Sequence, residues 1–456
     1  MESVLSRSSI CSVAVPLLFH LVTAPIRAQE PPQEPSARAQ RDPQGSREAR
    51  AVGVGPRGTD QETLPEPTEE EAQPGAEAKP KAPPRPPEGI LPLGEIARLS
   101  FAPSDRPRVF LQENRFVIVT ASGAVEGHDA ASGEFRWKLG LPGEPLFTPV
   151  LYRSDPFEIL LSSASGRLFF VDGETGEIRR ETPLPFELAL APLVDPPLLY
   201  LGTPAGDVVA YDVEKGSERF RAHIGEAPLA LALSGELIVA SGSERMLTGI
   251  DVGRGGERWR LRGRSGFHAP AVFAQDRLYI GNDAGEFYCL ALSSGDTQFR
   301  WATGASIRFA ALVEERFVYV TSFGNDLYSY QARGGTERYR VSLPGRPASG
   351  PVRFGRRLVV ATYDGAIVEV DPQKGVVAKT YEAPGELAAP PSFLAVLPSP
   401  GTDWWAAHRI GLALRTGEVL LLGHRAGAEE EKEEKEPEPP PPGETGTTRE
   451  DSLSWR

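Results

Sequence analysis

Residues 116–137 read "FVIVTASGAVEGHDAASGEFRW", and this stretch contains the pattern from which the fold can be predicted. An apolar run reaches a turn at Gly123, a second run ends at Asp129, and a third follows Gly133 and ends at Trp137. Short β-branched and aromatic runs separated by glycine turns are typical of antiparallel strands joined as hairpins. The stretch therefore predicts three consecutive strands.

The last part of this stretch, "DAASGEFRW", is one copy of a repeat. Six similar copies follow at intervals of about 40 residues, and each is preceded by the same strand–turn–strand pattern and by a short strand beginning near proline or alanine. The copies are "DGETGEIRR" (172–180), "DVEKGSERF" (212–220), "DVGRGGERW" (251–259), "LSSGDTQFRW" (292–301), "QARGGTERY" (331–339) and "DPQKGVVAKTY" (371–381). Four strands per unit at this period predict an all-β fold, a β-propeller of four-stranded antiparallel blades.

Three positions of the repeat are interpreted as structural. We expect the acidic residue to accept backbone N–H groups in the turn, the glycine to take a positive φ, and the ring to pack between blades. Arginines beside the ring would protect an outer strand from pairing with another edge. The acidic positions are Asp129, Asp172, Asp212, Asp251 and Asp371, the glycines are Gly133, Gly176, Gly216, Gly256, Gly295, Gly335 and Gly375, and the rings are Trp137, Phe220, Trp259, Trp301, Tyr339 and Tyr381.

The number of blades follows from the central hairpins. Their glycines are Gly123, Gly166, Gly206, Gly285, Gly324, Gly365 and Gly417, with a degenerate hairpin near Glu244, which makes eight. The last unit lacks its outer strand, whereas "LGEIARL" (93–99) resembles the outer strand "TGEIRR" (175–180). We therefore expect the N-terminal strand to complete the eighth blade, and seven blades are the alternative.

Three segments outside the propeller (90–425) have distinct compositions. Residues 1–28 have the layout of a secretory signal peptide with cleavage after Ala28, and an uncleaved anchor is the alternative. A proline- and glutamate-rich linker (29–89) and an acidic, proline-rich tail (426–456) have too few apolar side chains to fold, so we expect both to be disordered. The mature chain has no apolar run long enough for a transmembrane span.

Composition excludes several classes of function. A net charge of −13 argues against a nucleic-acid partner. Of the two cysteines, Cys11 leaves with the signal peptide and Cys289 lies in an apolar run, which predicts a buried inert thiol and no intrachain disulfide. The scattered histidines, including His268 at the start of an inner strand, have no zinc-ligand spacing. We predict no catalytic, cofactor-binding or metal-binding residue.

The repeat resembles that of the quinoprotein-type, or PQQ-like, propeller family, whose consensus is A-x-D-x-x-T-G-x-x-x-W. "GHDAASGEFRW" (127–137) and "GIDVGRGGERW" (249–259) match it best. The family includes PQQ-dependent dehydrogenases and non-catalytic envelope scaffolds of the BamB type. The alcohol dehydrogenases of the family have a vicinal cysteine pair and long insertions, which this chain lacks. We therefore expect no enzyme activity and no cofactor.

The resemblance and the signal peptide together favour an exported, monomeric scaffold of the periplasm or cell envelope that binds a protein partner. Outer-membrane protein assembly, as for BamB, is one specific version, although the lipidated cysteine of BamB proteins at the cleavage site is missing here. Two alternatives remain open. One is a PQQ-dependent dehydrogenase with PQQ and calcium, and the other is a propeller that senses a small ligand or a glycan.

Overall fold

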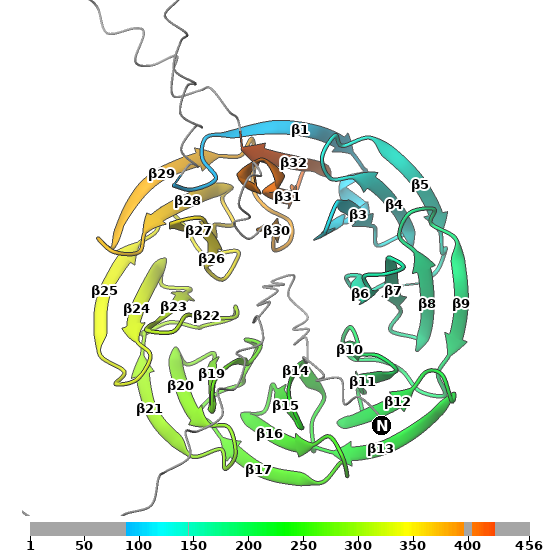
Figure 1. Cartoon of the computed structure of the whole chain (residues 1–456), viewed down its shortest axis with the longest axis horizontal. Coiled ribbons are helices and arrows are strands. Elements are labelled where there is room, and N and C mark those ends of the chain that lie inside the picture. Colours follow the sequence, from blue (N-terminus) through cyan, green and yellow to red (C-terminus); the bar gives the residue numbers. More distant parts are fainter. Residues whose placement is uncertain (1–87, 145, 396–403, 425–456) are drawn as a thin grey trace, which may run out of the picture. The chain divides into compact units, whose positions relative to one another are not determined.

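The computed structural model describes residues 88–144, 146–395 and 404–424, and this part of the chain forms a ring of eight blades around a central axis (Figure 1). Each blade is a four-stranded antiparallel sheet. The prediction of eight blades is confirmed, and the seven-bladed alternative is wrong. The predicted signal peptide (1–28), most of the linker (29–89) and the C-terminal tail (426–456) lie outside the described residues.

The strands follow one another from the inside of each blade to the outside. Blades 1 to 4 consist of β2 (Arg108–Gln112), β3 (Arg115–Val119), β4 (Ala124–Asp129), β5 (Phe135–Gly140); β6 (Val150–Arg153), β7 (Glu158–Ser162), β8 (Arg167–Asp172), β9 (Ile178–Pro183); β10 (Leu193–Asp195), β11 (Leu198–Gly202), β12 (Asp207–Asp212), β13 (Ser217–His223); and β14 (Pro228–Ser234), β15 (Leu237–Gly242), β16 (Met246–Asp251), β17 (Glu257–Arg262).

The remaining blades repeat this order, except that the eighth takes its outer strand from the start of the domain. Blades 5 to 8 consist of β18 (Val272–Ala274), β19 (Arg277–Gly281), β20 (Glu286–Ala291), β21 (Thr297–Ala302); β22 (Leu312–Val313), β23 (Phe317–Ser322), β24 (Asp326–Gln331), β25 (Glu337–Ser342); β26 (Val352–Phe354), β27 (Arg357–Ala361), β28 (Ala366–Asp371), β29 (Val376–Glu382); and β30 (Ser392–Leu394), β31 (Arg409–Ala413), β32 (Glu418–His424), β1 (Leu93–Ser100). Two short 3-10 helices, η1 (Pro103–Asp105) and η2 (Trp404–Ala407), lie between strands.

The apolar core lies between the blades rather than within one. A single sheet has two apolar faces, and each face is covered by the neighbouring blade, so eight separate clusters of buried side chains surround the axis. Tyr200 of blade 3, for example, shares a cluster with Leu231 of blade 4. The outer strands are much more exposed than the two middle strands of each blade. Radial stacking therefore buries apolar surface that no isolated blade could bury.

The ring closes through pairing of the first and last described strands, as predicted. β1 runs antiparallel to β32, with Leu93 opposite His424 and Ser100 opposite Glu418. The segment before β1 is also fixed, because the buried carboxylate of Glu369 accepts the backbone N–H groups of Ile90 (2.5 Å) and Leu91 (2.8 Å). Pairing the two ends leaves no open edge in the ring at this point.

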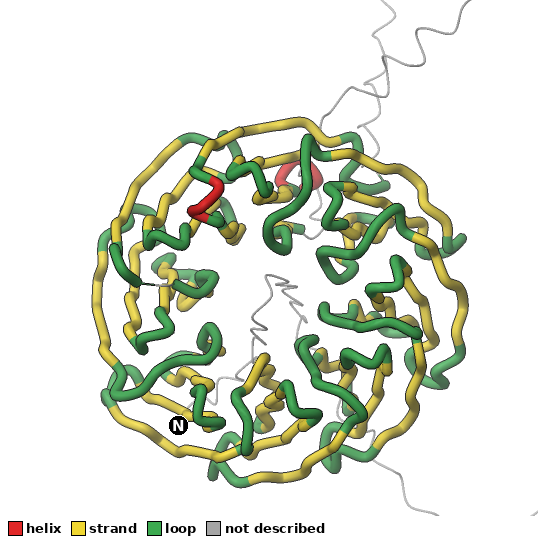
Figure 2. The backbone as a smooth tube through the Cα atoms, turned by 180° about the vertical axis from the view of Figure 1, so that it is seen from behind, coloured by secondary structure: helices red, strands yellow, loops and turns green. Residues whose placement is uncertain are grey.

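One face of the ring, here called the loop face, is built from the crossovers between blades and the central hairpins (Figure 2). In an antiparallel blade the fourth strand ends on the side where the second strand turns into the third, so both connections lie together. Backbone hydrogen bonds join them: Ile307 of the crossover from blade 5 to blade 6 donates to Asn282 O (3.0 Å), and Phe323 donates to Ser306 O (2.8 Å). This crossover is therefore tied to the central hairpins of both blades that it joins.

Candidate functional site

The acidic residue of the repeat closes the turn between the third and fourth strands. Asp129 Oδ1 accepts the backbone N–H groups of Ala131 (2.9 Å) and Ser132 (3.0 Å), and Oδ2 accepts from the Arg136 guanidinium (2.9 Å). Burial alone would raise the pKa of Asp129, but these donors together lower it to about 2. The arginine beside the ring thus neutralises the turn of its own blade.

The ring of the repeat contacts the next blade. Trp137 is 5% exposed and its Nε1 donates to Gly173 O of blade 2 (3.0 Å). Its indole lies between two glycines, because a Cβ built on Gly127 would be 2.1 Å from the ring and one on Gly176 would be 2.6 Å from it. The φ of Gly176 is 74°, so this glycine serves both the turn and the close approach.

At six of the eight junctions between blades, a side chain of one blade donates a hydrogen bond to a backbone carbonyl of the next blade. This carbonyl belongs to the residue directly after the acidic position of the repeat, and we call the bond the inter-blade latch. This inter-blade latch could not be predicted from the repeat, because its donors are different residue types. The bonds are Trp137 Nε1 to Gly173 O (3.0 Å), Arg180 Nη1 to Val213 O (3.3 Å), Trp259 Nε1 to Leu292 O (3.0 Å), Tyr279 Oη to Ala332 O (3.1 Å), Tyr339 Oη to Pro372 O (2.8 Å) and Arg409 Nε to Ala130 O (2.6 Å).

The structure corrects one of the predicted positions, and two of the rings occupy a different place along their strands. Gly255 (φ 69°), and not Gly256, takes the left-handed conformation in blade 4, since the turn requires the glycine four residues after Asp251. In blade 5 the ring four residues after the glycine is Phe299, which pairs with Cys289, and Trp301 lies two residues further along β21. Trp301 nevertheless packs between blades 5 and 6, because its ring stacks on Tyr330 at 4.3 Å between centroids. Tyr381 is likewise two residues further along its strand, and it packs against the cluster of buried side chains shared by blades 7 and 8.

Two hairpins on the loop face differ from those of the other blades in the residue that takes the positive φ. Asn325 (φ 65°), not Gly324, adopts the positive φ in blade 6. In blade 4 the degenerate hairpin places Arg245 at φ 81°, where glycine stands in other blades. The buried carboxylate of Glu226, from the preceding crossover, accepts the backbone N–H groups of Glu244 and Met246 (3.1 Å for Met246). A carboxylate thus stabilises a turn that lacks its glycine.

Blades 6 and 7 present a cluster on the loop face that we call the arginine–aromatic rim: Arg308, Phe309, Phe323, Arg346 and Tyr363. The Phe323 ring is its centre. The guanidinium carbons of Arg308 and Arg346 lie 5.8 and 5.5 Å from the centroid of that ring, within the range of cation–π attraction. The rings of Phe309 and Tyr363 lie 6.0 and 6.5 Å from it.

The charges of the rim are only partly neutralised. Arg308 Nε lies 3.1 Å from the carboxylate of Asp283 on blade 5, and the same carboxylate accepts from Ser306 Oγ (2.9 Å) and lies 2.6 Å from His268 Nδ1. Within the described ranges, no carboxylate lies within 4.0 Å of the Arg346 guanidinium. His268 therefore has a structural partner, and Arg346 offers an exposed cation.

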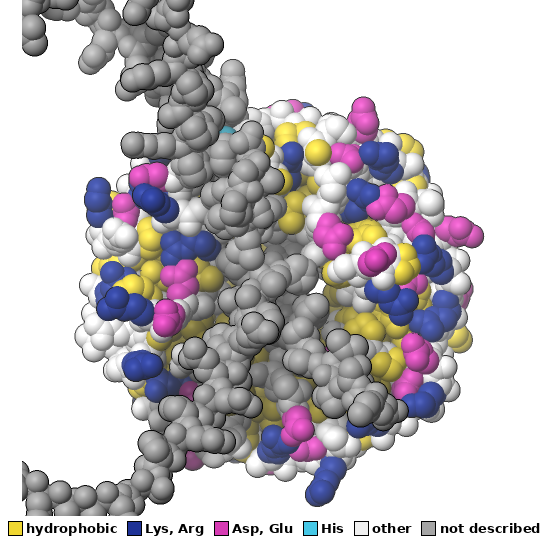
Figure 3. Space-filling model, viewed as in Figure 1, with side chains coloured by type: hydrophobic (Ala, Val, Ile, Leu, Met, Phe, Trp, Pro, Cys, Tyr) yellow, Lys and Arg dark blue, Asp and Glu magenta, His cyan; other side chains and the backbone are white. Residues whose placement is uncertain are grey.

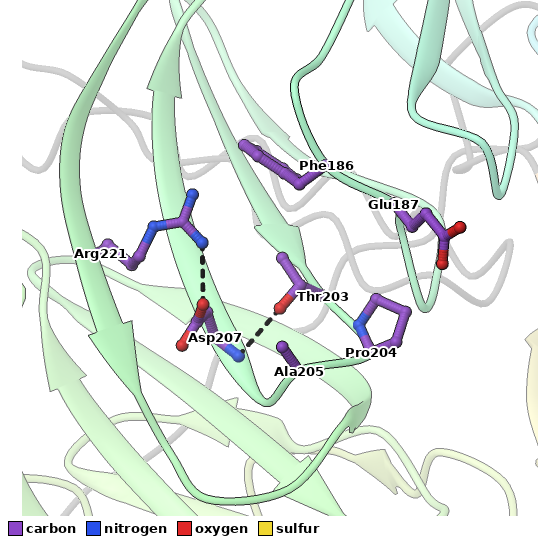
Figure 4. Close-up of a pocket in the computed structure, with 7 residues that line it drawn as sticks. All are labelled: Phe186, Glu187, Thr203, Pro204, Ala205, Asp207 and Arg221. Atoms are coloured by element: carbon purple, nitrogen blue, oxygen red, sulfur yellow. Dashed lines mark hydrogen bonds and ion pairs between the residues drawn. The ribbon is translucent and has the colours of Figure 1, made fainter.

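A shallow depression between blades 2 and 3, of about 240 Å³, is lined by residues that include Phe186, Glu187, Thr203 and Arg221 (Figure 4). Arg221 lies across the Phe186 ring, 4.9 Å from its centroid, and donates to Asp207 (2.8 Å). Small-molecule sites usually measure about 300–1,000 Å³. At about 240 Å³, this depression is smaller than that range.

The remaining polar chemistry is dispersed. No group of three or more His, Cys, Asp or Glu side chains in the described part of the chain is placed to hold a metal ion. Cys289 is fully buried, and burial raises the pKa of its thiol. No helix among the described residues is long and apolar enough to cross a membrane. On the face drawn in Figure 3, acidic and basic side chains alternate around the periphery, with apolar side chains nearer the axis.

Fold and loop face together define a closed eight-bladed propeller of the PQQ-like class. Among solved structures it is similar to BamB from Moraxella catarrhalis (TM-score 0.56, 15% identity, 73% of this chain and 99% of that chain) and to the computationally designed Ika8 protein (TM-score 0.55, 14% identity, 69% and 95%). It is also similar to Saccharomyces cerevisiae Sqt1 (TM-score 0.60, 10% identity, 72% and 98%). These likenesses show the fold.

The sequence itself matches the profile of a family described as "Outer membrane protein assembly factor BamB", over residues 94–303 and 297–433. This match spans most of the chain, so the chain belongs to that family, and the predicted resemblance to PQQ-like propellers is confirmed. A comparison with curated proteins finds no match.

Proposed function

We propose that this protein is a non-catalytic, exported propeller scaffold that binds a protein partner through its loop face. The observation that carries the proposal is the exposed guanidinium of Arg346, which is fixed over Phe323 without a carboxylate within 4.0 Å in the described residues. Arginine and aromatic side chains are enriched where binding energy is concentrated in protein interfaces. The backbone of the rim is held as well, since Tyr363 N donates to Arg346 O (2.8 Å).

Family membership supports the more specific form of this proposal. The family description names an outer membrane protein assembly factor, and a predicted signal peptide precedes the propeller. We therefore place the protein in the periplasm or cell envelope, where it would act as a monomer and contact a component of outer-membrane protein assembly. If the partner is of another kind, the scaffold function stands and only the proposed role in outer-membrane protein assembly is lost.

The proposal also holds that neither PQQ nor calcium is required. The carboxylates of the repeat are engaged in turns. Asp129 and Asp172, for example, each accept the backbone N–H groups of the residues two and three positions further along the chain. The purified protein should therefore give no quinone absorbance change and no dye-linked alcohol or sugar oxidation after addition of PQQ and calcium. Either signal would contradict a non-catalytic scaffold and favour the dehydrogenase alternative.

Site-directed photocrosslinking in cells tests the scaffold directly. A photoreactive residue at Ala284, an exposed position in the hairpin of blade 5, should capture a protein that mass spectrometry can identify. The matched control is Phe135, which is 59% exposed but lies on the outer strand β5. Equal capture from both positions, or none from Ala284, would overturn the proposal that the loop face binds a partner.

A further inference from the structure

We propose that the arginine–aromatic rim binds an extended acidic segment of a partner protein, with carboxylates at alternate residues engaging Arg308 and Arg346. This inference rests on the proposed function and identifies the chemistry of the bound segment. Its starting point is geometric: two guanidiniums lie within 6 Å of the centroid of one ring, Phe323, although they come from different crossovers.

The two arginines are oriented before any partner binds. One nitrogen of the Arg308 guanidinium is already engaged: Nε lies 3.1 Å from Asp283 Oδ1 and 3.2 Å from Ser306 Oγ. Its terminal nitrogens have no hydrogen-bond partner among the described residues, and nor does the guanidinium of Arg346. A planar guanidinium can bind a carboxylate through two parallel N–H groups. Contact with the Phe323 ring restricts both side chains, so less rotamer freedom is lost when a ligand binds.

The spacing fits an extended peptide. Side chains two residues apart in an extended chain project from the same side, at a separation of about 7 Å. Because both guanidiniums lie beside one ring, a segment with acidic residues at alternate positions can reach both while its hydrocarbon stems cover Phe323. The half-buried Tyr363 extends the apolar contact on one side, and the buried Phe309 supports the Phe323 ring from within.

The neighbouring charges favour a short acidic segment over a continuous polyanion. Asp283 lies beside Arg308, and the exposed Asp364 is placed with its carboxylate against Gly345, next to Arg346. His268 faces Asp283 from blade 5. A nucleic acid with a phosphate at every step would meet these carboxylates, whereas a peptide can place neutral residues there.

The test is a binding titration of the full-length protein with a fluorescent peptide in which glutamate alternates with alanine. The same peptide with lysine in place of glutamate is the ligand control. We expect saturable binding of the acidic peptide, and a loss of at least about tenfold in affinity for the double variant Arg308→Gln/Arg346→Gln. Phe323→Ala should also weaken binding by several fold, because the platform beneath both guanidiniums is removed.

Arg264→Gln is the matched protein control. Arg264 lies on the same face, is largely exposed, and is placed 3.4 Å from Glu286 with no contact to Phe323. Its substitution should change affinity by less than about twofold. Circular dichroism and an unchanged melting temperature verify that each variant is folded.

Several outcomes would overturn the inference. These are no binding of the acidic peptide, equal binding of the lysine peptide, equal loss in Arg264→Gln, or effective competition by a single-stranded oligonucleotide of the same charge. Photocrosslinking separates this failure from failure of the proposed function. If Ala284 still captures a partner in the double arginine variant, the scaffold stands and the rim is not the site. If Ala284 captures nothing even when both arginines are present, the proposal that the loop face binds a partner fails.

Discussion

Removal of the Trp137 indole is the most direct test of how the blades are held together. The ring is 5% exposed and lies between Gly127 and Gly176, which have no side chains that could move into the space it leaves. Large-to-small changes of buried aromatic residues cost about 3–5 kcal/mol, and a cavity that cannot relax belongs near the upper end of that range. We therefore expect Trp137→Ala to lower the free energy of unfolding by about 4–5 kcal/mol.

The assay is thermal unfolding followed by circular dichroism. With an unfolding entropy of about 2.1 cal/mol/K per residue over roughly 330 residues, this loss corresponds to a fall of about 6–7 °C in Tm. Trp137→Phe keeps most of the ring but removes the hydrogen bond to Gly173 O, and should cost only about 1–2 kcal/mol. Phe135→Ala, on the same strand but exposed, should stay within about 0.5 kcal/mol of the parent. A Tm of Trp137→Ala equal to that of Phe135→Ala would refute the role of the ring as an inter-blade wedge.

Three further predictions concern single residues. Gly225→Ala, at φ 94° with open space around it, should cost about 1–2 kcal/mol for the backbone alone. Gly176→Ala should cost about 1–3 kcal/mol more, since its new methyl group would meet Trp137, and equal Tm values for the two variants would argue against that contact. Burial, with smaller effects of His424 and Arg409, lowers the pKa of His408 to about 4 from 6.5. As the pH falls, His408 therefore takes up its proton at a higher pH in the unfolded chain than in the folded chain. The free energy of unfolding should fall by about 3 kcal/mol as the pH drops from 6.5 to 4. Urea titrations of His408→Gln should show a weaker pH dependence over this window, and an identical one would contradict the assignment. In a chain that begins at residue 29, Cys289 is the only cysteine, and it should react with a thiol reagent only after denaturation; rapid labelling of the native protein would show that it is accessible.

The architecture was predictable because the repeat determines it. A copy of Asp129 to Trp137 every 40 residues or so predicts both the four-stranded unit and its radial stacking. The likeness of residues 93–99 to an outer strand was sufficient to predict ring closure, which the pairing of Leu93 with His424 confirms. Errors arose where two similar residues compete, as at Gly255 and Gly256, because the choice depends on hydrogen-bond register, which adjacent glycines do not reveal.

The loop-face cluster could not be predicted in the same way. Arg308, Phe323 and Arg346 lie in non-repeating positions of three separate connections, and their proximity depends on the radial packing of blades 6 and 7. Asp283 approaches Arg308 from a third blade. The latch formed by Arg180 was missed for a related reason, since an arginine there replaces the ring of other blades while donating to the corresponding carbonyl, Val213 O. Sequence similarity reveals positions at which the same residue type recurs. It does not reveal a contact that recurs between blades but is made by a different residue type in each.

The pairing of β1 with β32 has a consequence for how the protein reaches its folded state. Strand 93–100 is made early, but its partner, 418–424, comes at the far end of the domain. Until that partner arrives, the early strand has no edge to pair with, and blade 1 has no cover for Phe116 and Ile118, which contact blade 8. Contacts of such large sequence separation slow folding. If the chain is exported as an unfolded polymer, its first strand must remain unpaired while the rest of the ring is delivered, so any delay near the C-terminus would expose an aggregation-prone edge at the N-terminus.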